Sequence, residues 1–214
     1  PMTSVSRTRV KICGITRPDD GVTAALLGVD AIGLVFYPPS PRFVNPDAAR
    51  QIVVALPPFI TVVGLFMNAE PAAVRAILAQ ASLHLLQFHG DEEPDDCVAF
   101  NLPYIKAVPM CANADLRDYE LRFATATGLL LDSHSGDQPG GSGQGFDWEK
   151  IPVKRNKPLI LAGGLHPGNV TTAIRQVQPY AVDVSSGVES AKGIKDAERM
   201  RAFLRGANEG GSNV

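Results

Sequence analysis

The chain has 214 residues, of which 45% are hydrophobic, and this suits one domain with a sizeable core. Its 20 Lys and Arg residues nearly balance 22 Asp and Glu residues, and the net charge of -2 excludes a general attraction for nucleic acid or for an anionic membrane. Neither a signal peptide nor the roughly 20-residue apolar run of a membrane span is found, and the 3 cysteines form no metal-type pairing, so a cytoplasmic protein is expected.

Eight short apolar stretches recur along the chain at similar intervals. They are almost continuous in Val, Ile and Leu, which is typical of parallel strands buried on both faces and not of a half-exposed antiparallel sheet. The predicted strands span residues 9–13, 31–36, 60–66, 83–88, 104–108, 128–132, 159–163 and 180–185.

Helical signals fill the segments between these strands. Pro18 and two acidic residues begin the first helical segment and Gly28 ends it, while Pro46 and Asp47 begin the second. Helices are predicted within residues 17–29, 45–56, 68–81, 94–100, 114–124, 166–177 and 196–207, and the stretch that follows residue 148 is only weakly helical.

The alternation of strands with helices predicts an α/β fold, a (β/α)8 TIM barrel of a single domain. The barrel is expected to span residues 9–207, with loose termini at residues 1–8 and 208–214. A doubly wound open sheet is the structural alternative. It is less favoured because no Gly-x-Gly-x-x-Gly motif follows the first strand and the repeating units have similar lengths.

Such a barrel carries its chemistry where strands end, so residues at the strand ends are the catalytic candidates. Cys13 ends the first strand beside Gly14, and if neighbours lower its pKa, its thiolate can remove a proton from carbon. A small buried structural thiol is the alternative. Asp132 ends a very apolar strand, where partial desolvation would keep it a proton donor near neutral pH; a turn or cap residue is the alternative there.

Three further side chains are candidates for holding a substrate. Arg42 lies in the stiff, proline-bearing loop after the second strand and can grip a carboxylate with two hydrogen bonds, unless it is a solvated surface charge. Gln87 and His89 occupy alternate positions at the end of the fourth strand and therefore the same side of it. Either can bond a substrate or be a satisfied polar residue that lines the barrel.

The last two strands end in glycine-containing turns, at the place where barrels commonly bind a phosphate. Glycines allow close backbone approach, and unpaired N–H groups at a helix start attract anions. The predicted phosphate-binding residues are Gly163, Gly164, Ser185, Ser186 and Gly187. Asp183, within the last strand, is given only a supporting role.

The segment 133–148 is too long and rich in glycine for a simple connection, and a lid over the barrel mouth is the functional interpretation of it. The histidines other than His89 are scattered without metal-ligand spacing, so no metal and no other cofactor is expected. Cys97, Cys111 and Trp148 are interpreted as structural or packing residues.

Together, these motifs resemble the phosphoribosylanthranilate isomerase family, and they follow its order from residue 10 to residue 196. The matching stretches are KICGIT, FYPPSPRFV, VGLFMN, LQFHG, LLLDS, GGSGQGFDW, LAGGLHPGNV and VDVSSGVE with GIKD. The resemblance implies a barrel that needs no metal or organic cofactor. It also implies an aldose-to-ketose (Amadori) rearrangement of N-(5-phosphoribosyl)anthranilate, a step of tryptophan biosynthesis.

The resemblance further implies roles for the candidate residues. Cys13 would take the proton from C2 of the sugar as general base, and Asp132 would protonate the furanose ring oxygen as general acid. Arg42 would orient the anthranilate carboxylate or the ribose, and Gln87 and His89 would line the pocket. The glycine and serine turns would hold the phosphate.

Two other functions stay open at this point. Another phosphosugar barrel enzyme, such as an epimerase or a lyase-type synthase, would share the phosphate turns, and a non-catalytic phosphosugar sensor would keep the pocket. The presence of both Cys13 and Asp132 speaks against the sensor. The expected partner is a small phosphosugar substrate, with no nucleic acid, no membrane and a monomer rather than an oligomer; a second substrate from the histidine pathway stays open.

Overall fold

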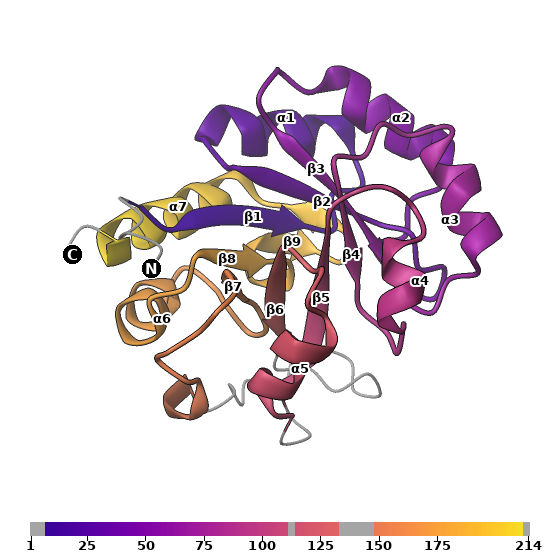
Figure 1. The fold of residues 1–214 in the computed structure, drawn as a ribbon. Helices are drawn as coiled ribbons and strands as arrows, with labels where there is room; N and C mark the ends of the chain where they lie inside the picture. Colours follow the sequence, from indigo (N-terminus) through magenta and orange to yellow (C-terminus); the bar gives the residue numbers. More distant parts are fainter. Residues whose placement is uncertain (1–6, 111–113, 133–147, 212–214) are drawn as a thin grey trace.

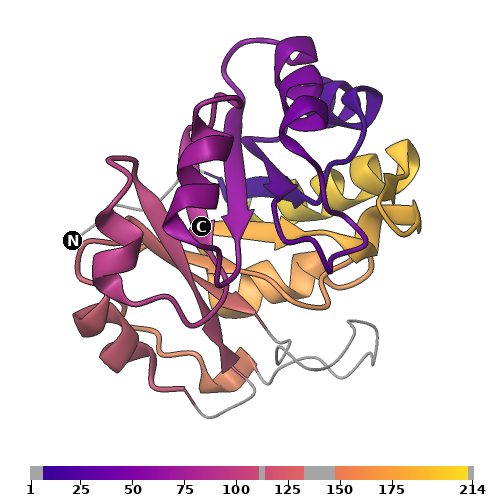
Figure 2. The ribbon, with the colours of Figure 1, turned by 90° about the vertical axis from the view of Figure 1, so that its right-hand side faces the viewer.

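The computed structural model describes residues 7–110, 114–132 and 148–211 of the chain. Eight parallel strands, β1 to β8, close into a barrel in chain order, and the closing pair is β1 with β8. The helices lie around the outside of the barrel (Figure 1), and the perpendicular view shows the same enclosure of the strands (Figure 2). The predicted (β/α)8 barrel is therefore confirmed.

All eight predicted strands and all seven predicted helices are present in the described residues. The barrel strands are β1 (Arg9–Cys13), β2 (Ala31–Val35), β3 (Thr61–Phe66), β4 (Leu85–Phe88), β5 (Tyr104–Pro109), β6 (Gly128–Asp132), β7 (Leu159–Leu161) and β8 (Ala181–Val184). The helices are α1 (Pro18–Leu27), α2 (Pro46–Ala55), α3 (Pro71–Leu78), α4 (Pro94–Val98), α5 (Leu116–Arg122), α6 (Val170–Val177) and α7 (Ala197–Gly211).

The connection that follows β6 differs from the others. Within the described residues it contributes only a short 3-10 turn, η2 (Trp148–Lys150), as the weak helical pattern there predicted. Trp148 packs against the main hydrophobic core, which agrees with its interpretation as a packing residue. The rest of the predicted lid, residues 133–147, lies outside the described residues, and so does Cys111.

Helix α7 is longer than the sequence predicted. It continues to Gly211, so the expectation of a loose tail is wrong for residues 208–211. The physical reason is close packing on α6, because a Cβ atom on Gly210 would lie 2.9 Å from Ile174 Cβ. A glycine that suggested flexibility is thus a contact point between two helices. Although α7 is 15 residues long, no helix in the described parts of the chain has the length and apolar character to cross a membrane.

The barrel wall separates two hydrophobic cores. Outward-pointing side chains such as Ile12 and Ile32 join the core under the helices. Inward-pointing side chains form a smaller cluster inside the barrel, made of Ile105, Ala107, Leu130, Ile160, Ala162 and Ala181. Because side chains alternate along a strand, Lys11 and Cys13 of β1 point inward, away from Ile12. The inside of the barrel is therefore partly apolar and partly charged.

A small antiparallel pair of strands after β8 was not predicted. The chain passes from β8 through a 3-10 turn, η3 (Ser186–Val188), into β9 (Glu189–Ala191), which pairs with β10 (Ile194–Lys195). The turn between the two strands uses Gly193 at φ 78°, a left-handed conformation that glycine adopts without strain. This hairpin carries two charged residues to the carboxyl end of the barrel.

The tight contact between α6 and α7 predicts that a larger side chain at Gly206 is destabilising. A Cβ atom there would lie 2.8 Å from Val170 Cγ1 and 3.1 Å from Thr171 Oγ1. Gly206→Leu should therefore lower the free energy of unfolding by about 1–3 kcal/mol, as measured by urea unfolding. The adjacent, exposed Arg205 gives the control, because Arg205→Leu should change stability by less than about 0.5 kcal/mol. Equal stabilities of the two variants would contradict the packing argument.

Candidate active site

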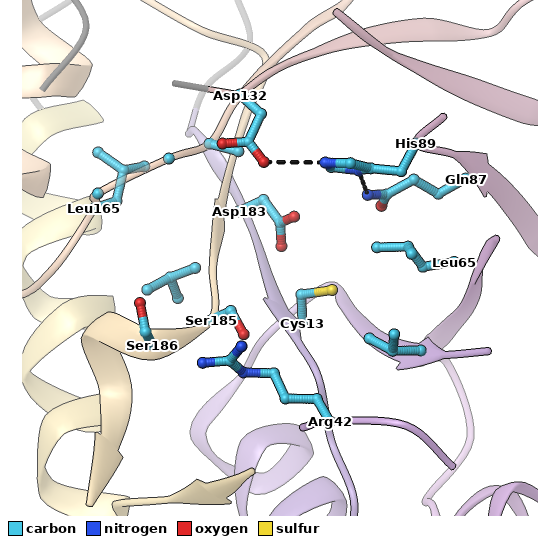
Figure 3. Close-up of a pocket in the computed structure, with 15 residues that line it drawn as sticks. Cys13, Arg42, Leu65, Gln87, His89, Asp132, Leu165, Asp183, Ser185 and Ser186 are labelled. Atoms are coloured by element: carbon cyan, nitrogen blue, oxygen red, sulfur yellow. Dashed lines mark hydrogen bonds and ion pairs between the residues drawn. The ribbon is translucent and has the colours of Figure 1, made fainter. Parts of the chain in front are cut away.

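A cavity opens at the carboxyl ends of the strands, where chemistry is expected in a barrel of this type. It has a volume of about 190 Å³ and is lined by residues on or just after β1, β2, β3, β4, β6, β7 and β8 (Figure 3). A larger cavity of about 560 Å³ lies at the amino ends of the strands, and none of the predicted site residues lines it. The smaller cavity is therefore the candidate active site.

The structure brings nearly all of the predicted site residues to this cavity. Those that line it are Cys13, Arg42, Gln87, His89, Asp132, Gly163, Gly164, Ser185 and Ser186. Gly187 is not part of the lining. A Cβ atom at Gly187 would overlap with the carbonyl oxygen of Leu165, so glycine is required there for the packing of two turns. Asp183, predicted only in a supporting role, does line the cavity.

Cys13 lies in the cavity wall and is almost fully buried, with 6% of its surface exposed. Burial raises the pKa of its thiol, Lys11 and Lys195 oppose the rise, and Asp183 adds to it. The sequence analysis required neighbours that lower this pKa. The two lysines act in that direction, but burial outweighs them, so the thiolate forms less readily than in an exposed cysteine.

Lys11 and Asp183 form an ion pair inside the barrel, next to Cys13. The Nζ–Oδ2 distance is 2.9 Å, and each side chain is only 7% exposed. Burial raises the pKa of Asp183, and the Lys11 ammonium counteracts only part of that rise. The second carboxylate oxygen of Asp183, Oδ1, is buried and has no hydrogen-bond partner among the described residues. Asp183 therefore presents an unused acceptor in a residue that lines the cavity.

Arg42 already holds a carboxylate that belongs to the protein. Its Nε and Nη2 donate hydrogen bonds to Oε1 and Oε2 of Glu189, each over 2.7 Å. The two-pronged grip that the sequence assigned to a substrate carboxylate is thus made with Glu189. Burial alone would raise the pKa of Glu189, but hydrogen bonds from Arg42 and Lys195 hold it below its ordinary value. Because Glu189 occupies the Nε–Nη2 edge of the guanidinium, a ligand in the cavity would have to meet another edge of it.

Lys195 is a site residue that the sequence analysis did not single out. Its side chain is 0% exposed, and Nζ donates to Glu189 Oε1 over 2.9 Å and to the Ser185 carbonyl oxygen over 3.2 Å. Burial lowers the pKa of its ammonium, and the adjacent Glu189 carboxylate offsets only part of this effect. The available signal was the GIKD stretch. Its meaning depends on the β9–β10 hairpin, which the sequence analysis did not predict.

Gln87, His89 and Asp132 form a chain of hydrogen bonds along the cavity wall (Figure 3). The distance from Gln87 Nε2 to His89 Nδ1 is 3.0 Å, and His89 Nε2 lies 3.1 Å from Asp132 Oδ2. Gln87 is 1% exposed, whereas the side chains of His89 and Asp132 are 24% and 16% exposed. The two residues predicted on one side of β4 are therefore together, and His89 contacts the predicted acid.

The turn after β7 contains two neighbouring glycines in the left-handed region. Gly163 and Gly164 have φ values of 78° and 66°, and neither N–H donates to another group in the described parts of the chain. They line the cavity together with Ser185 and Ser186. Helix α6 begins only at Val170, so the predicted helix start lies farther along the chain than the glycine pair. Unpaired backbone N–H groups and serine hydroxyls are suited to binding an anion.

The other histidines lie apart from this chain of hydrogen bonds. His84 Nδ1 accepts from the Val62 N–H over 3.0 Å at the amino end of β4, and His166 Nδ1 accepts from the Gly168 N–H over 3.1 Å. His134 lies outside the described residues. Within residues 7–110, 114–132 and 148–211, no group of three or more His, Cys, Asp or Glu residues is arranged to hold a metal ion.

Comparison with known protein families gives one result over nearly the whole chain. The family model described as N-(5'-phosphoribosyl)anthranilate (PRA) isomerase matches residues 10–206. A curated relative named N-(5'-phosphoribosyl)anthranilate isomerase, from Nitrosococcus oceani, is 54% identical over 202 residues, which cover 94% of this chain and 98% of the relative.

Solved structures agree with the sequence relatives. The crystal structure of phosphoribosyl anthranilate isomerase from Thermotoga maritima superimposes with a TM-score of 0.84 and 41% identity, covering 94% of this chain and 98% of that one. A second crystal structure of phosphoribosyl anthranilate isomerase gives a TM-score of 0.77 and 38% identity over the same shares. That protein is in complex with reduced 1-(o-carboxyphenylamino)-1-deoxyribulose 5-phosphate.

The raised pKa of Cys13 predicts a late onset of its reactivity toward alkylating reagents. Since the thiolate is the reactive form, the rate of modification by iodoacetamide should still be rising above pH 9.0, the ordinary pKa of cysteine. Peptide mass spectrometry measures the modification residue by residue. Cys97, which is 0% exposed and has its pKa raised to about 12 mainly by burial, is the slow reference. A midpoint for Cys13 below pH 9.0 would mean that the lysines outweigh burial.

Proposed function

This chain belongs to the N-(5'-phosphoribosyl)anthranilate isomerase family and is an isomerase of tryptophan biosynthesis, and we propose that Cys13 and Asp132 are the base and the acid of its reaction. The reaction converts N-(5'-phosphoribosyl)anthranilate, an aminoaldose, to the aminoketose 1-(2-carboxyphenylamino)-1-deoxyribulose 5-phosphate. The related structure that holds the reduced form of this ketose supports a phosphosugar ligand for the present chain.

In the proposed mechanism, only protons pass between the protein and the substrate. Asp132 protonates the furanose ring oxygen, the bond from that oxygen to C1 breaks, and the nitrogen lone pair forms a C1=N Schiff base. The Cys13 thiolate then removes the proton from C2, which gives an enaminol. A proton added at C1 and the loss of the hydroxyl proton at C2 yield the ketone, so no atom is gained or lost. These steps need no metal and no organic cofactor.

One observation carries this proposal: Cys13 and Asp132 come from β1 and β6, far apart in sequence, and both line the one cavity that also contains the glycine and serine turns. Burial raises the pKa of the Cys13 thiol overall, and the positive charges of Lys11 and Lys195 offset part of that rise in favour of the thiolate. Asp132 is held by a hydrogen bond from His89 and is thereby oriented toward a fixed partner.

The two anionic ends of the substrate would be held by different parts of the cavity. Gly163 and Gly164 offer backbone N–H groups, and Ser185 and Ser186 offer hydroxyls, for the phosphate. Arg42 would face the carboxylate of the anthranilate ring. Arg42 and Lys195 both form ion pairs with Glu189. Two cations beside one carboxylate leave one positive charge in excess next to the cavity. A cytoplasmic location and a monomeric state stay predictions, and light scattering tests the second.

Removal of either proposed catalytic group should reduce turnover without unfolding the barrel. Cys13→Ala and Asp132→Asn should each lower kcat about 10²- to 10⁴-fold, since each removes one positioned proton-transfer group. The measurement is an isomerase assay on freshly generated substrate, with thermal unfolding as the control for stability. A variant that keeps near wild-type turnover would remove its residue from the mechanism.

The phosphate site is tested by adding a negative charge where space permits. Among the described residues other than its chain neighbours, no atom lies within 4 Å of a Cβ added at Gly164, so a side chain fits, although the φ of 66° is strained for most residues. Gly164→Asp should raise KM about tenfold or more by repelling the phosphate. Gly164→Asn is the matched neutral control, because asparagine and aspartate have similar shapes and both tolerate this left-handed backbone conformation. Equal KM values for the two variants would contradict a phosphate at this turn.

A further inference from the structure

The chain of hydrogen bonds from Gln87 through His89 to Asp132 has a definite direction. An amide nitrogen only donates, so the contact from Gln87 Nε2 makes Nδ1 of His89 the acceptor. A neutral imidazole that accepts at Nδ1 carries its proton on Nε2. The imidazole then donates that proton to Oδ2 of Asp132 over 3.1 Å.

The opposite direction is sterically available but electrostatically weaker. Turning the Gln87 amide by half a rotation would present its oxygen to Nδ1 and move the imidazole proton there, so Nε2 could no longer donate to Asp132. Either orientation leaves one amide atom without a partner, and in this structure it is Oε1, which is buried. A hydrogen bond to a carboxylate is charge-assisted and is roughly twice as strong as one between neutral groups. The charge that Asp132 carries once it has given up its proton therefore favours the observed direction.

Burial makes Gln87 suited to hold this direction. Gln87 is 1% exposed, and its strand, β4, is paired with β3 on one side and β5 on the other. Bulk water therefore does not compete for hydrogen bonds to its amide. His89, by contrast, lies just after β4 and is partly exposed to the cavity. A rigid amide behind a more exposed ring fixes the ring plane and the position of its proton.

We propose that Gln87 and His89 are positioning residues for Asp132, with Gln87 keeping His89 as the Nε2–H tautomer and His89 orienting the carboxyl group. This inference rests on the proposed role of Asp132 as the acid. The contact between the imidazole and Oδ2 sets the plane of the carboxyl group that delivers the proton. When that proton passes to the ring oxygen of the sugar, the charge left on Asp132 is stabilised by the bond from His89. No proton leaves the imidazole in this step.

The tautomer of His89 is the first test, and it needs no substrate. Nitrogen-15 NMR of the side chain distinguishes the two tautomers of a neutral imidazole. In the wild-type protein the Nε2–H form should dominate, and in Gln87→Glu, whose carboxylate only accepts, the proton should move to Nδ1 or the ring should become doubly protonated. Gln87→Leu, which keeps a similar volume, should populate both tautomers. A neutral Nε2–H ring in Gln87→Glu would overturn the proposal.

A double-mutant cycle is the second test, because a merely structural role would not show coupling. His89→Leu should lower kcat about 10- to 100-fold in the wild-type background with little change in KM. In the Asp132→Asn background it should have almost no further effect, since its action passes through Asp132. The same loss in both backgrounds would overturn the positioning role. Near wild-type turnover of Asp132→Asn alone would instead overturn the acid itself, which separates failure of this inference from failure of the proposed function.

His84→Leu provides the matched control for the kinetic test. It makes the same chemical change before β4, at the amino end of the barrel, where His84 is exposed and accepts a hydrogen bond from Val62. Turnover should stay near the wild-type value in this variant. A loss as large as that of His89→Leu would show that the effect comes from disturbing β4 and would overturn the inference.

Discussion

The barrel closes on a buried ion pair, and the site depends on the register that this pair fixes. Lys11 of β1 and Asp183 of β8 lie directly opposite each other where the first strand meets the last. A buried pair gains little net energy, because desolvation offsets the attraction, but any register that separated the two charges would leave each one buried alone. Since inward positions alternate, the same register brings Cys13 and Ser185, each two residues further on, to the carboxyl end of the barrel.

A second buried carboxylate organises the rim of the cavity. Glu189 binds Arg42 and Lys195, and Lys195 also binds the backbone of Ser185. One group thus holds together the segment after β2, the β9–β10 hairpin and the turn after β8. The hydrogen bonds from Arg42 and Lys195 lower the pKa of Glu189 and so keep its carboxylate ionised in spite of burial. The positive charge left over acts on the cavity as a field, without requiring that Lys195, which is 0% exposed, touch a ligand.

The parts that sequence could predict are those that depend on local order. Apolar strands placed Cys13 and Asp132 at strand ends, and alternation placed Gln87 beside His89, because both rules operate within a few residues. The partners of Lys11 and Arg42 are 172 and 147 positions away, so their contacts become visible only once the barrel is closed.

Two features that the sequence analysis could not reach have the same physical origin. In a sequence, glycines near the end of the chain suggest flexibility. In the structure, Gly210 packs against Ile174 of α6, where a larger side chain would not fit. For Cys13, the position at the strand end was visible, whereas its pKa depends on burial and on lysines brought from both ends of the chain. Alternation applied to Lys11 as it was to Gln87 would have placed that lysine beside Cys13.

The proposed base and the proposed acid need different surroundings, and the barrel provides them on different strands. A thiolate gains from positive charge, and Cys13 has Lys11 and Lys195 near it, both partly neutralised by carboxylates. A general acid must donate its proton and then carry a negative charge. A hydrogen bond from an imidazole N–H stabilises that charge, whereas an adjacent ammonium group would keep the carboxylate ionised before it could donate a proton. In the proposed tautomer, His89 supplies such a donor to Asp132. The Lys11–Asp183 ion pair near Cys13 comes from β1 and β8, and the amide and imidazole near Asp132 come from the end of β4, on another part of the barrel. The two networks still interact, since Asp132 raises the pKa of Asp183.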